Sequence, residues 1–198
     1  MTQANSRTAD YPVDPIFLRR YSPRAFTGEA IPVPELMTLF EAARWAPSAY
    51  NSQPWRLFYA RRDTSHWPLF LGLLNEHNQT WAKNAAAIVV VASKPTFTPP
   101  QGGEVMTSKT PSYDTGAAWA NLALQATMMN WIAHGIVGFD LVRAGTDLKL
   151  PADWRVEAGI VIGRLGDKSI LPEALAAREG PNGRRPLSET AFEGGWAG

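Results

Sequence analysis

The run Ala85–Ala92 (AAAIVVVA) constrains the fold of this chain more than any other segment. Its eight residues are all apolar, without the polar alternation of a half-exposed strand. A strand of this kind is typical of a sheet that is covered on both faces. The chain has 198 residues, of which 45% are hydrophobic and 19% charged, which is enough for one substantial core but short for two. We therefore expect one domain, residues 1–198, built around a central strand.

Helical and strand patterns are interspersed around this run. Asp14 and Pro15 are typical of an N-cap and a first helical position, and predict a short helix through Arg20. A second helix is expected from near Pro34 until Pro47 stops it. The other predicted elements are helices over 64–75 and Asp114–Ala133, and strands over Trp55–Ala60 and Arg155–Arg164, the last with Val156, Ala158, Ile160 and Ile162 on one face. This mixture, without an internal repeat, predicts an α+β fold.

Three segments are less regular or less polar than the rest. The helix predicted over Asp114–Ala133 has few charges on any face, which favours burial, including burial across a subunit interface. The segment Lys94–Tyr113 is rich in proline and glycine and is long for a plain connection, so it is interpreted as either a mobile flap or a binding loop. The tail from Asp167 is expected to be loop-like.

Composition excludes several classes of function. A net charge of +1 argues against a broad nucleic-acid-binding surface, and the absence of cysteine excludes disulfides, thiolate catalysis and zinc–sulfur sites. The three histidines, His66, His77 and His134, lack the spacing of metal ligands, so no metal site is expected. No apolar run approaches the roughly 20 residues of a membrane helix. Because Met1–Asp10 also lacks the apolar core of a signal peptide, we expect a cytoplasmic protein.

Two polar segments point to a planar, phosphorylated ligand. Ala46–Trp55 (APSAYNSQPW) can place backbone N–H groups and short polar side chains along the edge of a flat heterocycle. Arg19–Phe26 (RRYSPRAF) supplies fixed positive charge for a phosphate or an anionic ring. One ligand that satisfies both segments is flavin mononucleotide, FMN.

Together with three further segments, these residues resemble the FMN-dependent nitroreductase family over nearly the whole chain. The further segments are Asn78–Trp81, Gly135–Asp140 and Arg184–Leu187. The resemblance implies that Arg184 and Arg185 hold the FMN phosphate and that Asn78 lies near the isoalloxazine ring. The full set of implied FMN-binding residues is Arg20, Tyr21, Ser22, Arg24, Pro47, Ser48, Asn51, Asn78, Gly135, Ile136, Val137, Gly138, Arg184 and Arg185. Tyr50 departs from the small residues usual in the family, and is expected on the substrate side of the site.

The resemblance also implies a fold, an assembly and an activity. The fold is a central mixed, mainly antiparallel sheet surrounded by helices, in an intertwined homodimer with two flavin sites at the interface. The activity is transfer of hydride from NADH or NADPH through FMN to small acceptors such as nitroaromatics, quinones or enones, by a ping-pong mechanism. No side chain is expected to be catalytic, because the flavin performs the chemistry. The alternatives are a flavin-dependent dehalogenase or other flavin chemistry on the same fold, and a non-catalytic flavin-binding protein.

Overall fold

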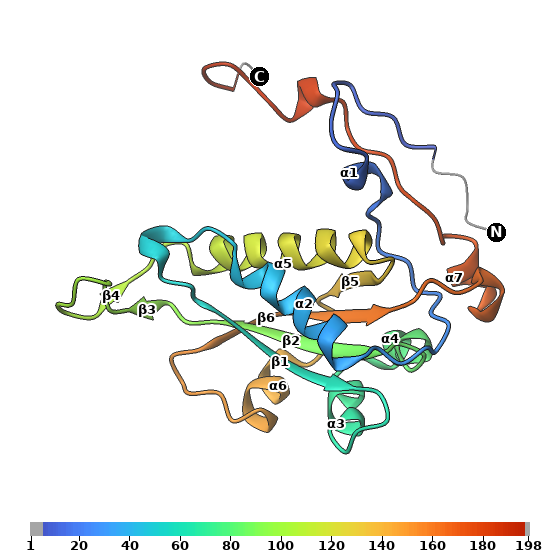
Figure 1. The fold of residues 1–198 in the computed structure, drawn as a ribbon, viewed down its shortest axis with the longest axis horizontal. Helices are drawn as coiled ribbons and strands as arrows, with labels where there is room; N and C mark the ends of the chain where they lie inside the picture. Colours follow the sequence, from blue (N-terminus) through green and yellow to red (C-terminus); the bar gives the residue numbers. More distant parts are fainter. Residues whose placement is uncertain (1–5, 197–198) are drawn as a thin grey trace.

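A computed structural model describes residues 6–196 and centres on a four-stranded sheet (Figure 1). The strands β1 (Trp55–Arg61), β2 (Ala87–Ser93), β6 (Arg155–Gly163) and β5 (Ile132–Ile136) lie in that order, and each neighbouring pair is antiparallel. All seven residues of β2 are buried. The apolar run therefore forms an internal strand, as predicted.

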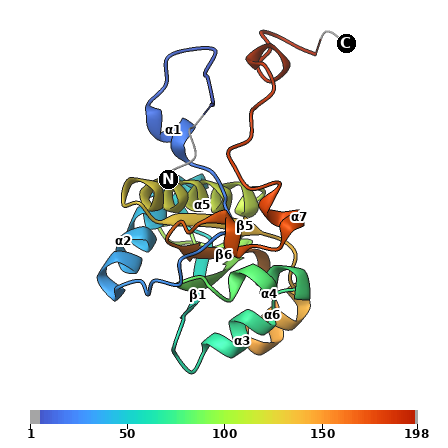
Figure 2. The ribbon, with the colours of Figure 1, turned by 90° about the vertical axis from the view of Figure 1, so that its right-hand side faces the viewer.

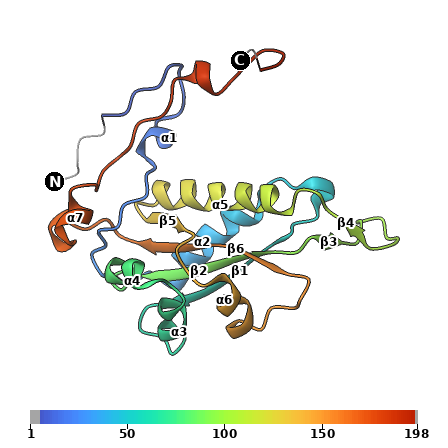
Figure 3. The same ribbon diagram turned by 180° about the vertical axis from the view of Figure 1, so that it is seen from behind.

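Helices cover both faces of this sheet (Figures 1 and 3). On one face, α2 (Val33–Arg44) and α5 (Pro111–Met128) pack over Val89 and Val91. On the other face, α3 (Trp67–Gly72), α4 (Glu76–Ala82) and α6 (Leu141–Asp147) pack over Ile88 and Val90. The smaller elements are α1 (Pro15–Arg19), η1 (Ala49–Asn51), β3 (Thr96–Phe97), β4 (Met106–Thr107), η2 (Lys168–Ile170), α7 (Glu173–Ala176) and η3 (Leu187–Glu189). Among residues 6–196, no helix combines the length and the apolarity needed to cross a bilayer.

The longest predicted helix ends earlier than its apolar pattern suggested. Helix α5 stops at Met128, and the residues from Ile132 form β5, which pairs with β6. Asn130, between them, has a φ of 59°, a left-handed conformation that asparagine tolerates better than most residues and that ends a helix. The prediction that the helix continues to Ala133 is therefore wrong. The apolar residues after Met128 are equally compatible with an edge strand, and the chain forms β5 there.

The strand β6 also departs from its predicted alternation. Ile160 and Ile162 join the core beneath α2 and α5, but Val156 packs on the opposite face of the sheet. The pairing with β2 shifts between Val91 and Ala92, which leaves Glu157 as an extra residue between the paired Ala158 and Val156. A β-bulge of this kind reverses the alternation, so the four residues do not share one face.

Several elements lie in segments that were predicted as loops or as one helix. The predicted helix over 64–75 is shorter, and α4 begins after it where the Asn75 side chain accepts a hydrogen bond from Asn78 N. The segment Lys94–Tyr113 contains the short β3–β4 hairpin and the start of α5. The arms before α1 and after α7 extend away from the sheet and its helices (Figure 2).

Candidate functional site

An arginine-lined cavity of about 410 Å³ lies where the segment after α1 meets β5 and the segment after α7. It is lined by Arg7, Arg20, Ser22, Arg24, His134, Arg178, Glu179, Gly180, Asn182 and Arg184. Five of these residues are arginines and one is a carboxylate. The structure thus brings Arg20, Ser22, Arg24 and Arg184, four of the predicted site residues, to one place.

Local hydrogen bonds hold the segment that carries Arg20 and Arg24. The Arg20 guanidinium donates to Ser22 Oγ at 3.3 Å. The carboxylate of Glu179 accepts from the backbone N–H groups of Arg24 and Ala25, the latter at 2.9 Å, and lies 3.6 Å from Arg24 Nη1. Glu179 is buried, so this contact fixes the segment against the chain that follows α7.

The cavity carries an excess of positive charge. Burial lowers the pKa of Arg20, and the charges of Arg7 and Arg184 lower it further. Glu179 is the only carboxylate among the lining residues, and its Oε1 already serves two backbone donors. Guanidinium groups that converge in this way fit a phosphate, which they can bind by charge-assisted, bidentate hydrogen bonds. The donor set therefore fits the phosphate of FMN.

His134 connects this cavity to the predicted segments Asn78–Trp81 and Gly135–Asp140. Its Nδ1 lies 2.9 Å from the carbonyl oxygen of Pro23, and because a carbonyl can only accept, Nδ1 carries the proton. The ring packs against Trp81, with 4.9 Å between centroids. Trp81 Nε1 donates to Asn78 Oδ1 at 3.3 Å, and Asn78 Nδ2 donates to the carbonyl oxygen of Gly138 at 3.0 Å. His134 was not predicted to belong to the candidate site, because its contacts with Pro23 and Trp81 join segments that are far apart in the chain.

The apoprotein should lose stability on acidification through His134. Burial lowers the pKa of His134 below its ordinary value of 6.5, helped by Arg24 and Arg20 and opposed by the hydrogen bond to Pro23 and by Glu179. Between pH 6.5 and the lowered pKa, the unfolded chain binds a proton that the folded chain does not. The free energy of unfolding therefore decreases as the pH is lowered, by at most about 1.4 kcal/mol per pH unit. Urea unfolding at several pH values should show a shallower slope for His134→Gln than for the exposed control His66→Gln. Equal slopes would contradict the assignment.

Asn78 and Gly138, two residues of the set implied by the resemblance, lie in close contact. A Cβ atom on Gly138 would lie 2.6 Å from Asn78 Nδ2 and 2.8 Å from Asn75 Nδ2. Asn78 lies in the first turn of α4 and Gly138 in the loop after β5. Both side-chain polar atoms of Asn78 have protein partners, so the loop and helix are fixed together.

Gly138→Ala should therefore disturb this contact. Either the two asparagine amides or the loop must move, and such overpacking typically costs about 1–3 kcal/mol. Gly183→Ala is the matched control, because Gly183 lies outside any helix and no atom lies within 4 Å of its added Cβ. Urea unfolding of both variants and of the wild-type protein tests the contact. A Gly138→Ala protein as stable as Gly183→Ala would show that the amides rearrange freely.

The remaining residues of the glycine-containing segment differ in exposure. Gly135 and Ile136 belong to β5, and Ile136 is buried. A Cβ atom on Gly135 would lie 3.0 Å from Trp119 Cζ2, so the strand approaches α5 closely there. Val137 is 76% exposed and offers its side chain to solvent.

The segment with Pro47, Ser48, Tyr50 and Asn51 lies elsewhere in the chain. Ala49 N donates to Asp114 Oδ2 at 3.1 Å, which attaches this segment to the first turn of α5. Helix α5 has 18 residues and is therefore about 27 Å long. Figures 1 and 3 show η1 and α7 beyond opposite ends of α5. One chain alone therefore does not bring this segment to the arginine-lined cavity, so that contact of both with one ligand stays a prediction for a dimer.

This segment is conformationally unusual. Tyr50, Asn51 and Gln53 have φ values of 55°, 51° and 45°, in the left-handed region that L-residues other than glycine seldom adopt. Ser48 Oγ accepts from Gln53 N at 3.0 Å and closes the turn. The Tyr50 ring is 67% exposed and packs against Phe97 of the hairpin, at 5.7 Å between centroids. Such strain commonly accompanies a binding role.

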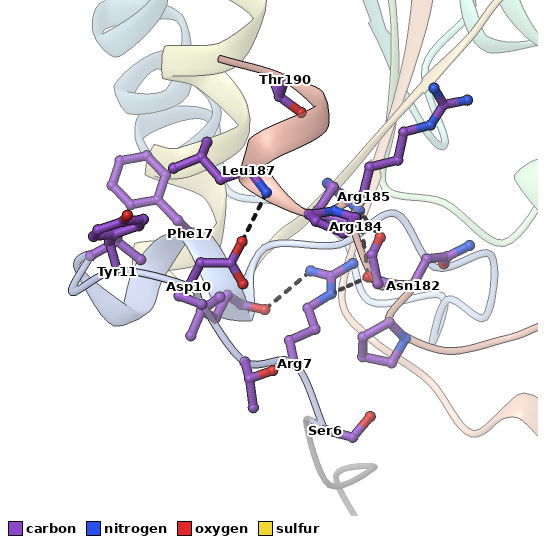
Figure 4. A pocket seen from close by; sticks show the side chains of 17 residues that line it. Ser6, Arg7, Asp10, Tyr11, Phe17, Asn182, Arg184, Arg185, Leu187 and Thr190 are labelled. Atoms are coloured by element: carbon purple, nitrogen blue, oxygen red, sulfur yellow. Dashed lines mark hydrogen bonds between the residues drawn. The ribbon is translucent and has the colours of Figure 1, made fainter. Parts of the chain in front are cut away.

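The two neighbouring arginines Arg184 and Arg185 do not line the same set of cavities. Arg184 lines the arginine-lined cavity, whereas Arg185 lines only a larger cavity of about 740 Å³ between the two arms (Figure 4).

Tyr21 is half-buried and lines neither cavity. Burial, reinforced by the charge of Glu179, raises the pKa of Tyr21. Within residues 6–196, no group of three or more acidic or histidine side chains is arranged to hold a metal ion.

Besides His134, five residues that line the arginine-lined cavity were not predicted from the sequence. These are Arg7, Arg178, Glu179, Gly180 and Asn182. None belongs to a motif, and each reaches the site because an arm or the chain after α7 returns to the segment after α1. No local pattern in the sequence could have identified them.

Known proteins are similar to this chain in sequence and in fold. The model of the nitroreductase family matches residues 18–66. A solved structure described as an oxidoreductase containing FMN is 50% identical, covers 100% of both chains and has a TM-score of 0.94. A nitroreductase from Desulfovibrio desulfuricans, solved in complex with FMN, is 25% identical over 93% of this chain and 99% of its own, with a TM-score of 0.69.

An uncharacterized 15.4 kDa protein of Mycolicibacterium smegmatis is 33% identical over 126 residues, which are 63% of this chain and 80% of that protein. The solved structures confirm the predicted α+β, nitroreductase-like fold, with helices around a largely antiparallel sheet. The chain belongs to the nitroreductase family.

Proposed function

We propose that this chain is an FMN-dependent oxidoreductase that passes hydride from NAD(P)H to small electrophilic acceptors. The observation that carries the proposal is the arginine-lined cavity, whose excess positive charge suits the FMN phosphate. The relative that covers the whole chain at 50% identity is described as an oxidoreductase containing FMN, which supports the same cofactor here.

The residues of this chain would bind and orient the cofactor. Arg20, Arg24 and Arg184, with the Ser22 hydroxyl, would hold the phosphate through charge-assisted hydrogen bonds. Bound FMN itself supplies hydride and electron transfer. The ring would lie toward a second group of residues, which comprises Tyr21, Asn78, Gly135, Ile136, Val137 and Gly138, with Pro47, Ser48 and Asn51 of a second subunit. We assign no side chain a catalytic role.

We further propose that the functional unit is a homodimer. The segment with Ser48 and the arginine-lined cavity lie at opposite ends of α5, so a second copy is needed to bring one beside the other. Helix α5 leaves an apolar stripe partly or fully exposed, at i, i+4, i+7, i+11 and i+15. It comprises Tyr113, Ala117, Ala120, Leu124 and Met128. The C-terminal arm also exposes Phe192 and Trp196, as is typical of a segment that another copy covers.

Reconstitution and kinetics test the proposal. The purified protein should retain about one non-covalent FMN per chain, and light scattering should give twice the 21.7 kDa mass of one chain. Steady-state oxidation of NADH and NADPH with a nitroaromatic or a quinone should give the parallel double-reciprocal lines of a ping-pong mechanism. A protein that is reduced once and does not turn over would be a flavin-binding protein instead. Turnover only with halogenated substrates would favour a dehalogenase, and failure to bind FMN would overturn the proposal.

A further inference from the structure

The N-terminal arm, residues 6–14, lies against the C-terminal arm, residues 181–196. Arg7 Nε donates to the carbonyl oxygen of Asn182 at 2.7 Å, and Leu187 N donates to Asp10 Oδ2 at 2.8 Å (Figure 4). The family model begins at residue 18, so the N-terminal arm lies outside the matched segment. Its contacts with the site are therefore argued from this structure alone.

Arg7 connects the two segments that supply the phosphate-binding arginines. Its Nη1 donates to the carbonyl oxygens of Leu18, at 3.1 Å, and Arg20, at 2.6 Å. Its Nε reaches Asn182, two residues before Arg184. One guanidinium thus joins the backbone of Arg20 to the backbone beside Arg184, a link that a compact ammonium group cannot reproduce.

This link acts against electrostatic repulsion. Burial and the charge of Arg184 lower the pKa of Arg7, and Arg7 and Arg184 in turn lower that of Arg20. Three guanidinium groups therefore lie close together without an equal number of carboxylates. An anion that binds between these like charges relieves their repulsion. The binding free energy is most favourable when the chain already holds the charges in place, because no ordering cost is then incurred on binding.

We propose that Arg7 is a positioning residue for the phosphate site: it ties the Arg20 segment to the Arg184 segment, so that both arginines are in place before FMN binds. The inference rests on the proposed function, because it takes the FMN phosphate as the anion. Arg7 acts through the carbonyl groups that it holds, and its effect should therefore depend on the ligand phosphate.

The test compares FMN with riboflavin, which has the same ring and no phosphate. Apoprotein is titrated with each flavin, and the two dissociation constants give a phosphate selectivity. Arg7→Gln should weaken FMN binding by about tenfold, the equivalent of one charge-assisted hydrogen bond, and leave riboflavin binding unchanged within about twofold. Arg19→Gln is the matched control, because Arg19 is exposed on α1 and its loss removes the same charge from the same part of the chain. It should retain the wild-type selectivity.

Arg7→Lys separates positioning from charge. A lysine keeps the charge but cannot hold three carbonyl groups on two segments, so its phosphate selectivity should fall nearly as far as that of Arg7→Gln. Wild-type selectivity in Arg7→Lys would show that charge alone suffices, and an equal loss for both flavins in Arg7→Gln would show a general structural role; either result overturns the inference. If the wild-type protein binds FMN no better than riboflavin, the proposed phosphate site itself is wrong.

Discussion

Arg20→Ala is expected to weaken FMN binding by about 1.5–3 kcal/mol, the usual range for hydrogen bonds to a charged group. Arg20 lines the arginine-lined cavity, and its guanidinium is held near Ser22, Arg7 and Arg184. The loss corresponds to a rise in the dissociation constant of roughly ten- to a hundredfold. Titration of the apoprotein with FMN measures it. Turnover should largely recover at saturating FMN, because the residues around the ring are unchanged.

Arg185→Ala is the matched control for this prediction. Both arginines belong to the sequence-predicted set, but Arg185 is exposed and does not line the cavity with Arg20. The variant should bind FMN within a few-fold of the wild-type protein, because an exposed charge that does not line the proposed phosphate site contributes little. The opposite result, a large loss for Arg185→Ala and none for Arg20→Ala, would place the phosphate in the larger cavity between the arms.

The sequence predicted those parts of the molecule that depend on local pattern. The apolar run Ala85–Ala92 indicated an internal strand because the absence of alternation requires cover on both faces. Asp14 and Pro15 indicated the start of α1, where the Asp14 side chain accepts from Ile16 N. Arg20, Ser22 and Arg24 could be predicted together because they belong to one short motif.

The parts that could not be predicted depend on contacts between distant segments. The apolar residues after Met128 suit a helix or an edge strand equally, and only pairing with β6 decides between them. The bulge at Glu157 depends on the register with β2, which no local pattern encodes. Arg7 and Glu179 reach the site from segments 13 and 155 residues away from their partners Arg20 and Arg24. Such residues carry no motif, although they determine where the motif residues lie.

Glu179→Ala is expected to lower the free energy of unfolding of the apoprotein by about 3 kcal/mol. The Glu179 carboxylate accepts from the backbone N–H groups of Arg24 and Ala25, and Ala25 is fully buried. Each buried donor left without a partner costs about 1–3 kcal/mol. The ion pair with Arg24 should add little, because the Arg24 side chain is 28% exposed and remains partly hydrated.

Glu179→Gln separates the two contributions, because its amide oxygen can still accept from both N–H groups while the charge is lost. We expect Glu179→Gln to lower the free energy of unfolding by about 1 kcal/mol. The exposed control Glu189→Ala should change it by no more than about 0.5 kcal/mol. Urea unfolding should be measured without FMN, since ligand binding would add its own stabilisation to the folded state. Equal stabilities for Glu179→Ala and Glu179→Gln would show that the backbone N–H groups find other partners. Glu179 is the only carboxylate that lines the cavity. If Glu179→Ala lowers stability but the folded variant binds FMN as tightly as the wild-type protein, the role of Glu179 is to hold the arginine segment, and the carboxylate does not affect phosphate affinity.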